Sequence, residues 1–258
     1  MRAAFLAALA LLLAAPAGAS AQALVDAPQT IQRVKGSVVA VGTFQRTRSP
    51  AYRFLGTGFA VGDGLTIVTN AHVLPATLDA DKLETIAILI AGQGREAQLR
   101  PATRGASDPA HDLALLRIEG APLPPLAVRD SDGVREGEAV LFTGFPIGNV
   151  LGPHPATHRG MVAAITPIAI PPANSAQLDP RMVRQLTSGA FPVFQLDATA
   201  YPGNSGSPVY SPATGEVIGV VNMVFVKGTK ESALTQPSGI TYAIPSRYLA
   251  ELMKRGGR

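Results

Sequence analysis

The sequence predicts an all-β protein, built as a barrel or a sandwich. Short runs of apolar and β-branched residues recur along the chain, and clusters of Gly, Pro, Asn and Asp separate most of them. Many short strands with regular turn signals are typical of these architectures. Strands are expected at Ser37–Phe44, Gly58–Val61, Thr66–Thr69, Thr85–Ile90, Asp112–Ile118, Glu138–Thr143, Met161–Thr166, Val193–Leu196, Val217–Val226 and Ile240–Ile244.

Length and composition fit a folded chain with a real core and exclude several other classes. The chain has 258 residues, of which 47% are hydrophobic and 16% are charged, so it is neither collagen-like nor largely disordered. It contains no Cys, which excludes a disulfide scaffold and a thiolate metal site. The formal net charge of +4 is mild and does not indicate a nucleic-acid partner.

The first 21 residues are typical of a secretory signal peptide. Arg2 precedes a wholly apolar run, Ala3–Ala15, which is shorter than the roughly 20 residues needed to span a bilayer. Pro16 breaks this run, and small residues predict cleavage after Ala21 or Ala23. The mature chain is therefore expected to be exported, to the periplasm or the medium, without a stable membrane anchor.

A helical period of apolar residues is evident only at the C-terminal end. There Pro245 precedes Ser246, which is expected to cap a helix that carries Leu249 and Leu252 on one face. Residues 171–189 show no clear pattern and are expected to form a long surface loop.

Three short motifs carry residues suited to nucleophilic catalysis. His72 ends the motif TNAH, Asp112 lies in HDLALL, and Ser205 lies at the centre of PGNSGSP. Each motif alone is weak, because a lone His is more often structural and a Gly-rich run is more often a plain loop. Together, in the order His, Asp, Ser along an all-β chain, they indicate a serine that is activated by a neighbouring base.

These motifs resemble the catalytic signatures of the chymotrypsin/trypsin-like serine peptidases, and most closely the HtrA/Deg-like protease domain. TNAHV, HDLALLRI and PGNSGSPV carry the resemblance, and GTGFAV, GFPIG, QLDAT and ITYAIPSRYL support it. The resemblance implies two antiparallel β-barrels with a cleft between them, followed by a short C-terminal helix. Residues 22–129 would form the first barrel, with His72 and Asp112, and residues 130–258 the second, with Ser205.

The resemblance also implies the role of each residue. His72 would take the proton of Ser205, Asp112 would orient the imidazole, and the N–H groups of Gly203 and Ser205 would form an oxyanion hole. The expected activity is peptide-bond hydrolysis through an acyl-enzyme, with no metal and no cofactor. Protein or peptide substrates are the expected partners.

Other His and Asp residues fit these roles less well. His111 adjoins Asp112, and because neighbouring strand residues point to opposite faces, His111 is expected to be solvated. Asp108 is the alternative acid, but it precedes a Pro in a turn-like stretch. His154 and His158 lie four residues apart among prolines that forbid a helix, so a metal site there is not expected.

The chain departs from the family pattern in three places. Asn204 stands where digestive members carry an Asp that pairs with a new N-terminus, so processing beyond signal removal is not expected to be needed. Eight residues follow Ala250, which leaves no room for the PDZ domain that is usual in HtrA-like proteins. Peptide-gated regulation is therefore expected to be absent.

The third departure concerns substrate specificity. GNSGSPV also resembles secreted glutamyl endopeptidases, but no His follows His158, which disfavours Glu specificity. Thr199 stands where trypsin-like pockets carry an Asp, so a Lys or Arg side chain would lose its ion pair. We expect an uncharged pocket for small or medium residues, lined by Thr199, Asn222 and Met223.

Two other functions remain as alternatives. The chain could be a catalytically silent binding protein on the same fold, although the intact triad argues against this. Its basic surface could instead dock on anionic polymers of the cell envelope, but the Lys and Arg residues are scattered along the chain, as on an ordinary solvated surface. The oligomeric state is not predicted.

Overall fold

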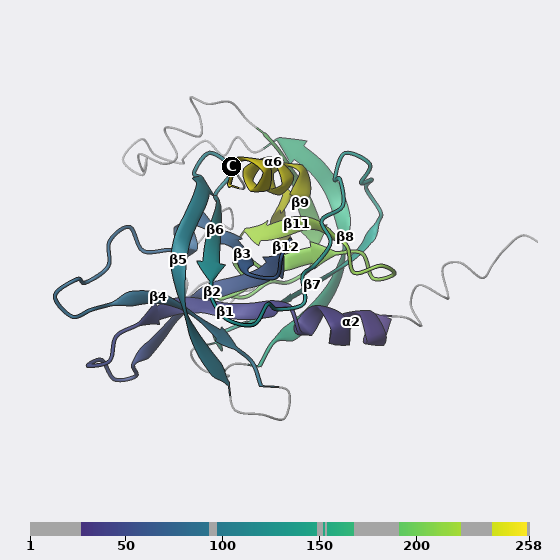
Figure 1. The fold of residues 1–258 in the computed structure, drawn as a ribbon. Helices are drawn as coiled ribbons and strands as arrows, with labels where there is room; N and C mark the ends of the chain where they lie inside the picture. Colours follow the sequence, from purple (N-terminus) through teal and green to yellow (C-terminus); the bar gives the residue numbers. More distant parts are fainter. Residues whose placement is uncertain are drawn as a thin grey trace, which may run out of the picture.

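The computed structural model contains two closed antiparallel β-barrels (Figure 1). It describes residues 27–92, 97–148, 152, 154–167, 191–222 and 239–256. The first barrel has the strand order β1-β2-β3-β6-β5-β4. Its strands are β1 (Val38–Phe44), β2 (Tyr52–Val61), β3 (Thr66–Asn70), β4 (Thr85–Ile90), β5 (Gln98–Asp108) and β6 (Leu113–Ile118).

The second barrel has the strand order β10-β11-β12-β9-β8-β7. Its strands are β7 (Ala139–Gly144), β8 (Ala156–Pro167), β9 (Pro192–Asp197), β10 (Pro208–Tyr210), β11 (Val217–Asn222) and β12 (Ile240–Pro245). The structure confirms the expected fold class and most of the expected strands. The predicted signal peptide, residues 171–189 and the end of the predicted strand beyond Asn222 lie outside the described residues.

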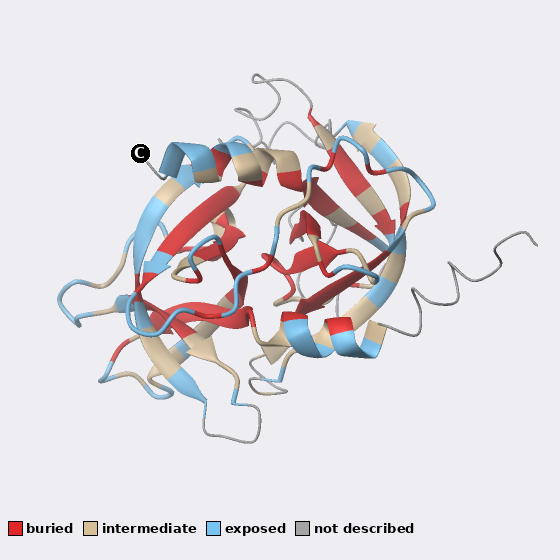
Figure 2. Cartoon of the chain, turned by 45° about the vertical axis from the view of Figure 1, so that its right-hand side comes forward, coloured by how far each residue is buried: buried red, intermediate tan, exposed pale blue. Residues whose placement is uncertain are grey.

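Buried residues line the inside of both barrels, and a third cluster joins them (Figure 2). Side-chain alternation explains how one strand serves two of these clusters. In β1, Val39 and Val41 point into the first barrel, whereas Val38 and Ala40 pack in the cluster shared with the second barrel. A strand buried on both faces reads as a continuous apolar run, which is why β1 is recognisable in the sequence.

Two strands and one α-helix were not expected from the sequence. β5 is mostly polar and buries only Ala102 and Asp108, and β10 is only three residues long. The helix α2 (Ala27–Lys35) precedes β1 and buries only Thr30 and Val34. A short helix with so few buried positions gives a weak apolar period.

The predicted C-terminal helix is confirmed as α6 (Ser246–Gly256), but its N-terminus is held differently from the expectation. The Ser246 hydroxyl donates to the carbonyl of Arg129 at 2.5 Å. The backbone N–H of Arg247 donates to the hydroxyl of Ser131 at 3.0 Å. A serine distant in sequence therefore caps the helix. Among the described residues, no helix has the length and apolar character required to cross a membrane.

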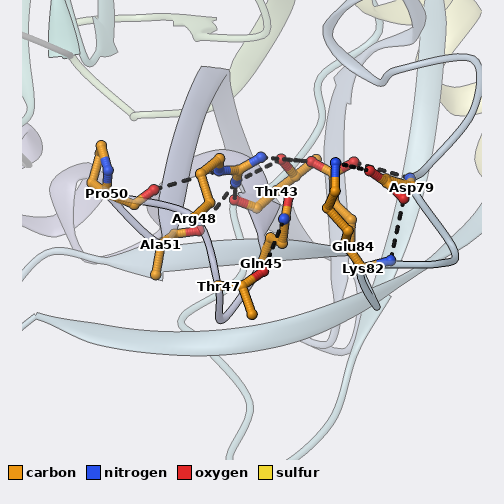
Figure 3. Close-up of polar contacts among 9 residues, drawn as sticks. All are labelled: Thr43, Gln45, Thr47, Arg48, Pro50, Ala51, Asp79, Lys82 and Glu84. Carbon is orange, nitrogen blue, oxygen red and sulfur yellow. Dashed lines mark hydrogen bonds and ion pairs between the residues drawn. The ribbon is translucent and has the colours of Figure 1, made fainter.

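A network of polar contacts around Glu84 connects three segments of the first barrel (Figure 3). Glu84, just before β4, accepts hydrogen bonds from Thr43 Oγ1 at 2.6 Å and from Arg48 Nη1 at 2.7 Å. The second oxygen of Glu84 accepts the backbone N–H of Asp79 at 3.1 Å. One carboxylate thus joins the end of β1, the β1–β2 loop and the segment before β4.

Candidate active site

The carboxylate of Asp112 is the centre of a hydrogen-bond cluster beside β3 and β6. Its Oδ1 accepts the backbone N–H of His72 at 2.8 Å, and its Oδ2 lies 2.5 Å from His72 Nδ1. The main-chain carbonyl of Asp112 accepts bonds from Asn70 Nδ2 and Ala71 N, both at 3.1 Å. Asp112 has a φ of +53°, in a region that Asp adopts more readily than most residues. These bonds fix both its backbone and its side chain.

His72 lies in a short 3-10 helix, η1 (Ala71–Val73), directly after β3. Because an ionised carboxylate only accepts hydrogen bonds, Nδ1 of His72 carries the proton of the 2.5 Å contact with Asp112. In the neutral imidazole, the other ring nitrogen, Nε2, then keeps a lone pair. An imidazole held in this tautomer is suited to act as a general base.

A third residue holds Asp112 from the opposite barrel. Asn222, at the end of β11, is fully buried, and its Nδ2 donates to Asp112 Oδ2 at 2.8 Å. Sequence reasoning placed Asn222 only in the pocket wall. The sequence did contain a signal for this role. Asn222 ends the apolar run VIGVVN, and an amide buried with such a run needs a hydrogen-bond partner.

The segment Pro202–Pro208, called here the nucleophile loop after the role predicted for Ser205, has bonded and unbonded N–H groups. The N–H groups of Asn204, Gly206 and Ser207 donate to the carbonyls of Tyr201, Val221 and Asn204, at 2.9–3.0 Å. Within the described part of the chain, the N–H groups of Gly203 and Ser205 have no acceptor. Ser205 is buried and Gly203 is partly buried. N–H groups without a partner are rare away from solvent, and two of them in one tight loop favour a site for an external acceptor.

The conformation of this loop depends on glycine at two positions. Gly203 has a φ of +103°, and a Cβ there would lie 2.3 Å from the carbonyl oxygen of Phe145. Gly206 has a φ of +86°, and a Cβ there would lie 2.1 Å from the carbonyl oxygen of Thr57. Both glycines are therefore required by the backbone conformation and by close packing.

The two barrels bring Ser205 close to the segment that carries His72. A Cβ added at Gly56 would lie 2.8 Å from the side chain of Val73 and 3.1 Å from the carbonyl oxygen of Ser205. The same glycine of β2 therefore faces both the residue after His72 and the main chain of Ser205. Gly206, next to Ser205, is bonded to Val221, next to Asn222. Ser205 is thus linked to the His72 segment through Gly56, and to Asp112 through Gly206, Val221 and Asn222.

The predicted pocket residues lie in different surroundings. Thr199 is partly buried between Ala198 and Ala200, in the segment between β9 and the nucleophile loop. Asn222 directs its amide nitrogen to Asp112, and Met223 lies outside the described residues.

The prediction that His111 is solvated is wrong. Its Nδ1 lies 3.0 Å from Asp108 Oδ2, and its ring stacks on Tyr248 of α6 with the centroids 4.0 Å apart. Arg255 also binds the Asp108 carboxylate, at 2.6 Å. The helix α6 covers this side of the β5–β6 turn, which the alternation of strand residues could not reveal. Asp108 is therefore paired with His111 and Arg255, and Asp112 is the carboxylate that contacts His72.

The remaining His residues do not gather around a common centre. His158 stacks on Phe142 with the ring centroids 4.8 Å apart, and burial lowers the pKa of its imidazole. His154 is exposed, and its backbone N–H donates to Gly152. No group of three His, Asp or Glu side chains in the described ranges is arranged to hold a metal ion.

Comparison with known families agrees with this geometry. The family described as "Trypsin-like peptidase domain" matches residues 56–220, which is more than half of the chain and spans all three motifs. The chain belongs to the trypsin-like peptidase family. Within this family it is similar to HtrA-type proteases, which confirms the resemblance drawn from the motifs.

Two curated relatives illustrate the similarity. The chain is 36% identical over 203 residues to the mitochondrial serine protease HTRA2 of Bos taurus. It is 32% identical over 208 residues to a probable periplasmic serine endoprotease, DegP-like, of Ectopseudomonas mendocina (strain ymp). These matches cover 78% and 79% of this trypsin-like chain but only 36% of either relative, so it spans about a third of their length.

Solved structures support the same fold. The HtrA-type protease AlgW with a tripeptide matches with a TM-score of 0.61 and 26% identity, over 88% of this chain and 62% of that one. The active form of the Rv3671c protease from M. tuberculosis matches with a TM-score of 0.64. At 21% identity, over 91% of this chain and 86% of that one, it supports the fold alone.

Proposed function

We propose that this chain is an exported serine endopeptidase that uses Ser205, His72 and Asp112 as a catalytic triad. Ser205 Oγ attacks the substrate carbonyl carbon while His72 Nε2 takes its proton. The C–N bond then breaks, and His72 returns the proton to the leaving amine. Water hydrolyses the resulting acyl-enzyme by the same route in reverse.

Asp112 maintains the tautomer of His72 that this cycle needs. Its carboxylate binds both the ring and the backbone N–H of His72, at 2.5 and 2.8 Å. It also stabilises the imidazolium that forms when Ser205 is deprotonated. Asn222 supports Asp112 from the second barrel through the 2.8 Å bond to Oδ2.

The observation that carries this proposal is the pair of N–H groups of Gly203 and Ser205. They lack an acceptor among the described residues, although the N–H groups of Asn204, Gly206 and Ser207 are all bonded. The two free donors flank Asn204 and fit the role of an oxyanion hole for the tetrahedral intermediate. Each such donor lowers the barrier by roughly 3–4 kcal/mol.

The substrate class follows from the family and from the residues near the site. HtrA-type relatives are named as proteases, and one was solved with a tripeptide, which favours peptide substrates here. Thr199 is uncharged where a trypsin-like pocket has an Asp, so cleavage after small or medium uncharged residues is proposed. The periplasmic DegP-like relatives support export of this chain.

Labelling with a fluorophosphonate tests the proposal. The purified mature protein should label covalently, and Ser205→Ala should not, because the probe reacts only with an activated serine hydroxyl. Ser37→Ala is the matched control, since Ser37 is also buried but its hydroxyl has no hydrogen-bond partner among the described residues. Folded wild-type protein that fails to label, or a Ser205→Ala variant that still labels, would overturn the triad.

A further inference from the structure

We infer that Thr57 of the first barrel is a positioning residue, which holds the nucleophile loop in the conformation that leaves the Gly203 and Ser205 N–H groups free. This inference rests on the proposed function, because those N–H groups are its oxyanion donors. Thr57 is fully buried in β2 and touches the loop with both its side chain and its backbone.

The hydroxyl of Thr57 joins two segments of the second barrel. Its Oγ1 donates to the carbonyl of Gly203 at 2.7 Å and accepts the backbone N–H of Phe145 at 3.0 Å. The directions are fixed, because a carbonyl can only accept and an N–H can only donate. The single hydroxyl proton is therefore committed to Gly203.

The backbone of Thr57 adds a second attachment. Its N–H donates to the carbonyl of Ser205 at 2.8 Å, and its own carbonyl accepts the hydroxyl of Thr69 at 2.8 Å. One residue thus holds the carbonyls of both Gly203 and Ser205, the two residues with free N–H groups. Fixing these carbonyls restricts the ψ angles of Gly203 and Ser205, and with them the shape of the loop.

Phe145 connects this contact to the orientation of the Gly203 N–H. Two residues after Phe145, Ile147 donates its backbone N–H to the carbonyl of Pro202 at 2.7 Å. In a trans peptide the C=O and N–H point in opposite directions, so this bond turns the N–H of Gly203 away from Ile147. Ile147 has a φ of +49°, an unfavourable conformation for a β-branched residue that the surrounding structure must maintain.

Close packing leaves little room for another arrangement around the hydroxyl. A Cβ added at Gly144, next to Phe145, would lie 2.9 Å from Thr57 Oγ1 and 2.0 Å from Ser207 Oγ. The motif GTG of β2, the motif GFPIG that begins at the last residue of β7 and the nucleophile loop therefore meet at Thr57. Removal of the hydroxyl would leave the carbonyl of Gly203 and the N–H of Phe145 without this partner.

Isosteric variants test this role. Thr57→Val keeps the shape of the side chain but removes the hydroxyl, and Thr57→Ser keeps the hydroxyl. Thr43→Val is the matched control, because Thr43 is a buried first-barrel threonine whose hydroxyl bonds to Glu84 and Arg48 and not to the nucleophile loop. Fluorophosphonate labelling rates, corrected for the folded fraction, are measured beside hydrogen–deuterium exchange of the peptide spanning 201–207.

We expect Thr57→Val to label about 10- to 100-fold more slowly than wild type, with faster exchange in residues 201–207. Thr57→Ser should restore most of the labelling rate, and Thr43→Val should change neither measurement. Labelling and exchange at wild-type values in Thr57→Val would overturn the inference. So would an equal defect in Thr43→Val, which would indicate a general loss of stability.

The two proposals fail in distinguishable ways. If folded wild-type protein does not label at all, the proposed function is wrong, and the exchange of residues 201–207 alone then decides whether Thr57 holds the loop. If wild-type protein labels and only the Thr57 prediction fails, the triad stands and the loop is held by its other contacts.

Discussion

Asn222 Nδ2 lies 2.8 Å from Asp112 Oδ2, and this hydrogen bond crosses from the second barrel to the first. Asp112 also binds His72 through both carboxylate oxygens. The orientation of the His–Asp pair therefore depends on how the two barrels are packed, as well as on the strands of the first barrel.

Replacement of Asn222 should lower the turnover of peptide substrates. Asn222→Asp would place a second carboxylate against Asp112, and the repulsion should reduce kcat at least 100-fold at neutral pH. Asn222→Ala removes one donor without adding charge and should reduce kcat by about 10-fold. Steady-state kinetics across pH test this, because only for the Asp variant should the deficit in kcat relative to wild type at the same pH shrink when acid protonates the new pair. Equal kcat values for the two variants would contradict the electrostatic explanation.

Glu84 should contribute to stability in a pH-dependent way. The hydrogen bond from Thr43, followed by those from Asp79 N and Arg48, lowers the pKa of Glu84 from its usual 4.5 to about 2. A carboxyl whose pKa is lowered by folding stabilises the protein above its unfolded pKa, and this stability is lost as the pH falls towards the folded value.

We therefore expect Glu84→Gln to reduce the free energy of unfolding by about 1–2 kcal/mol at pH 7, after allowance for solvent screening. The difference from wild type should shrink below pH 4.5 and disappear only as the pH falls below about 2. Urea denaturation at several pH values measures this. Glu119→Gln, at an exposed carboxylate, is the control. A difference that stayed constant between pH 7 and pH 3 would rule out the ionised network as its cause.

Three glycines separate the effect of backbone conformation from that of packing. Gly206→Ala combines a φ of +86° with a Cβ 2.1 Å from the carbonyl of Thr57. Gly137→Ala has the unfavourable φ of +88° in open space, and Gly133→Ala has neither problem. We expect Gly206→Ala to reduce the free energy of unfolding by more than about 3 kcal/mol and Gly137→Ala by about 1 kcal/mol. Gly133→Ala should leave it nearly unchanged. Thermal denaturation gives the order, and a Gly206→Ala variant as stable as Gly133→Ala would contradict the close packing of the nucleophile loop.

The sequence predicted the elements whose local pattern is strong. β1 and β4 were found because their apolar runs are buried on one or both faces. β5 and α2 were missed because few of their side chains are buried. The partial burial of His111 was also missed, since the covering ring of Tyr248 comes from a helix at the far end of the chain.

The sequence by itself determined the all-β class, the trypsin-like family and the three motifs with His72, Asp112 and Ser205, because these depend on local patterns of residues. Only the tertiary structure decided how those motifs are held. Asn222 is 110 residues from Asp112, and Thr57 is 146 residues from Gly203. Such pairs form only when both barrels close and pack together, because a hydrogen bond needs its two atoms within about 3 Å in a fixed orientation. No local sequence pattern predicts which of these distant residues come into contact.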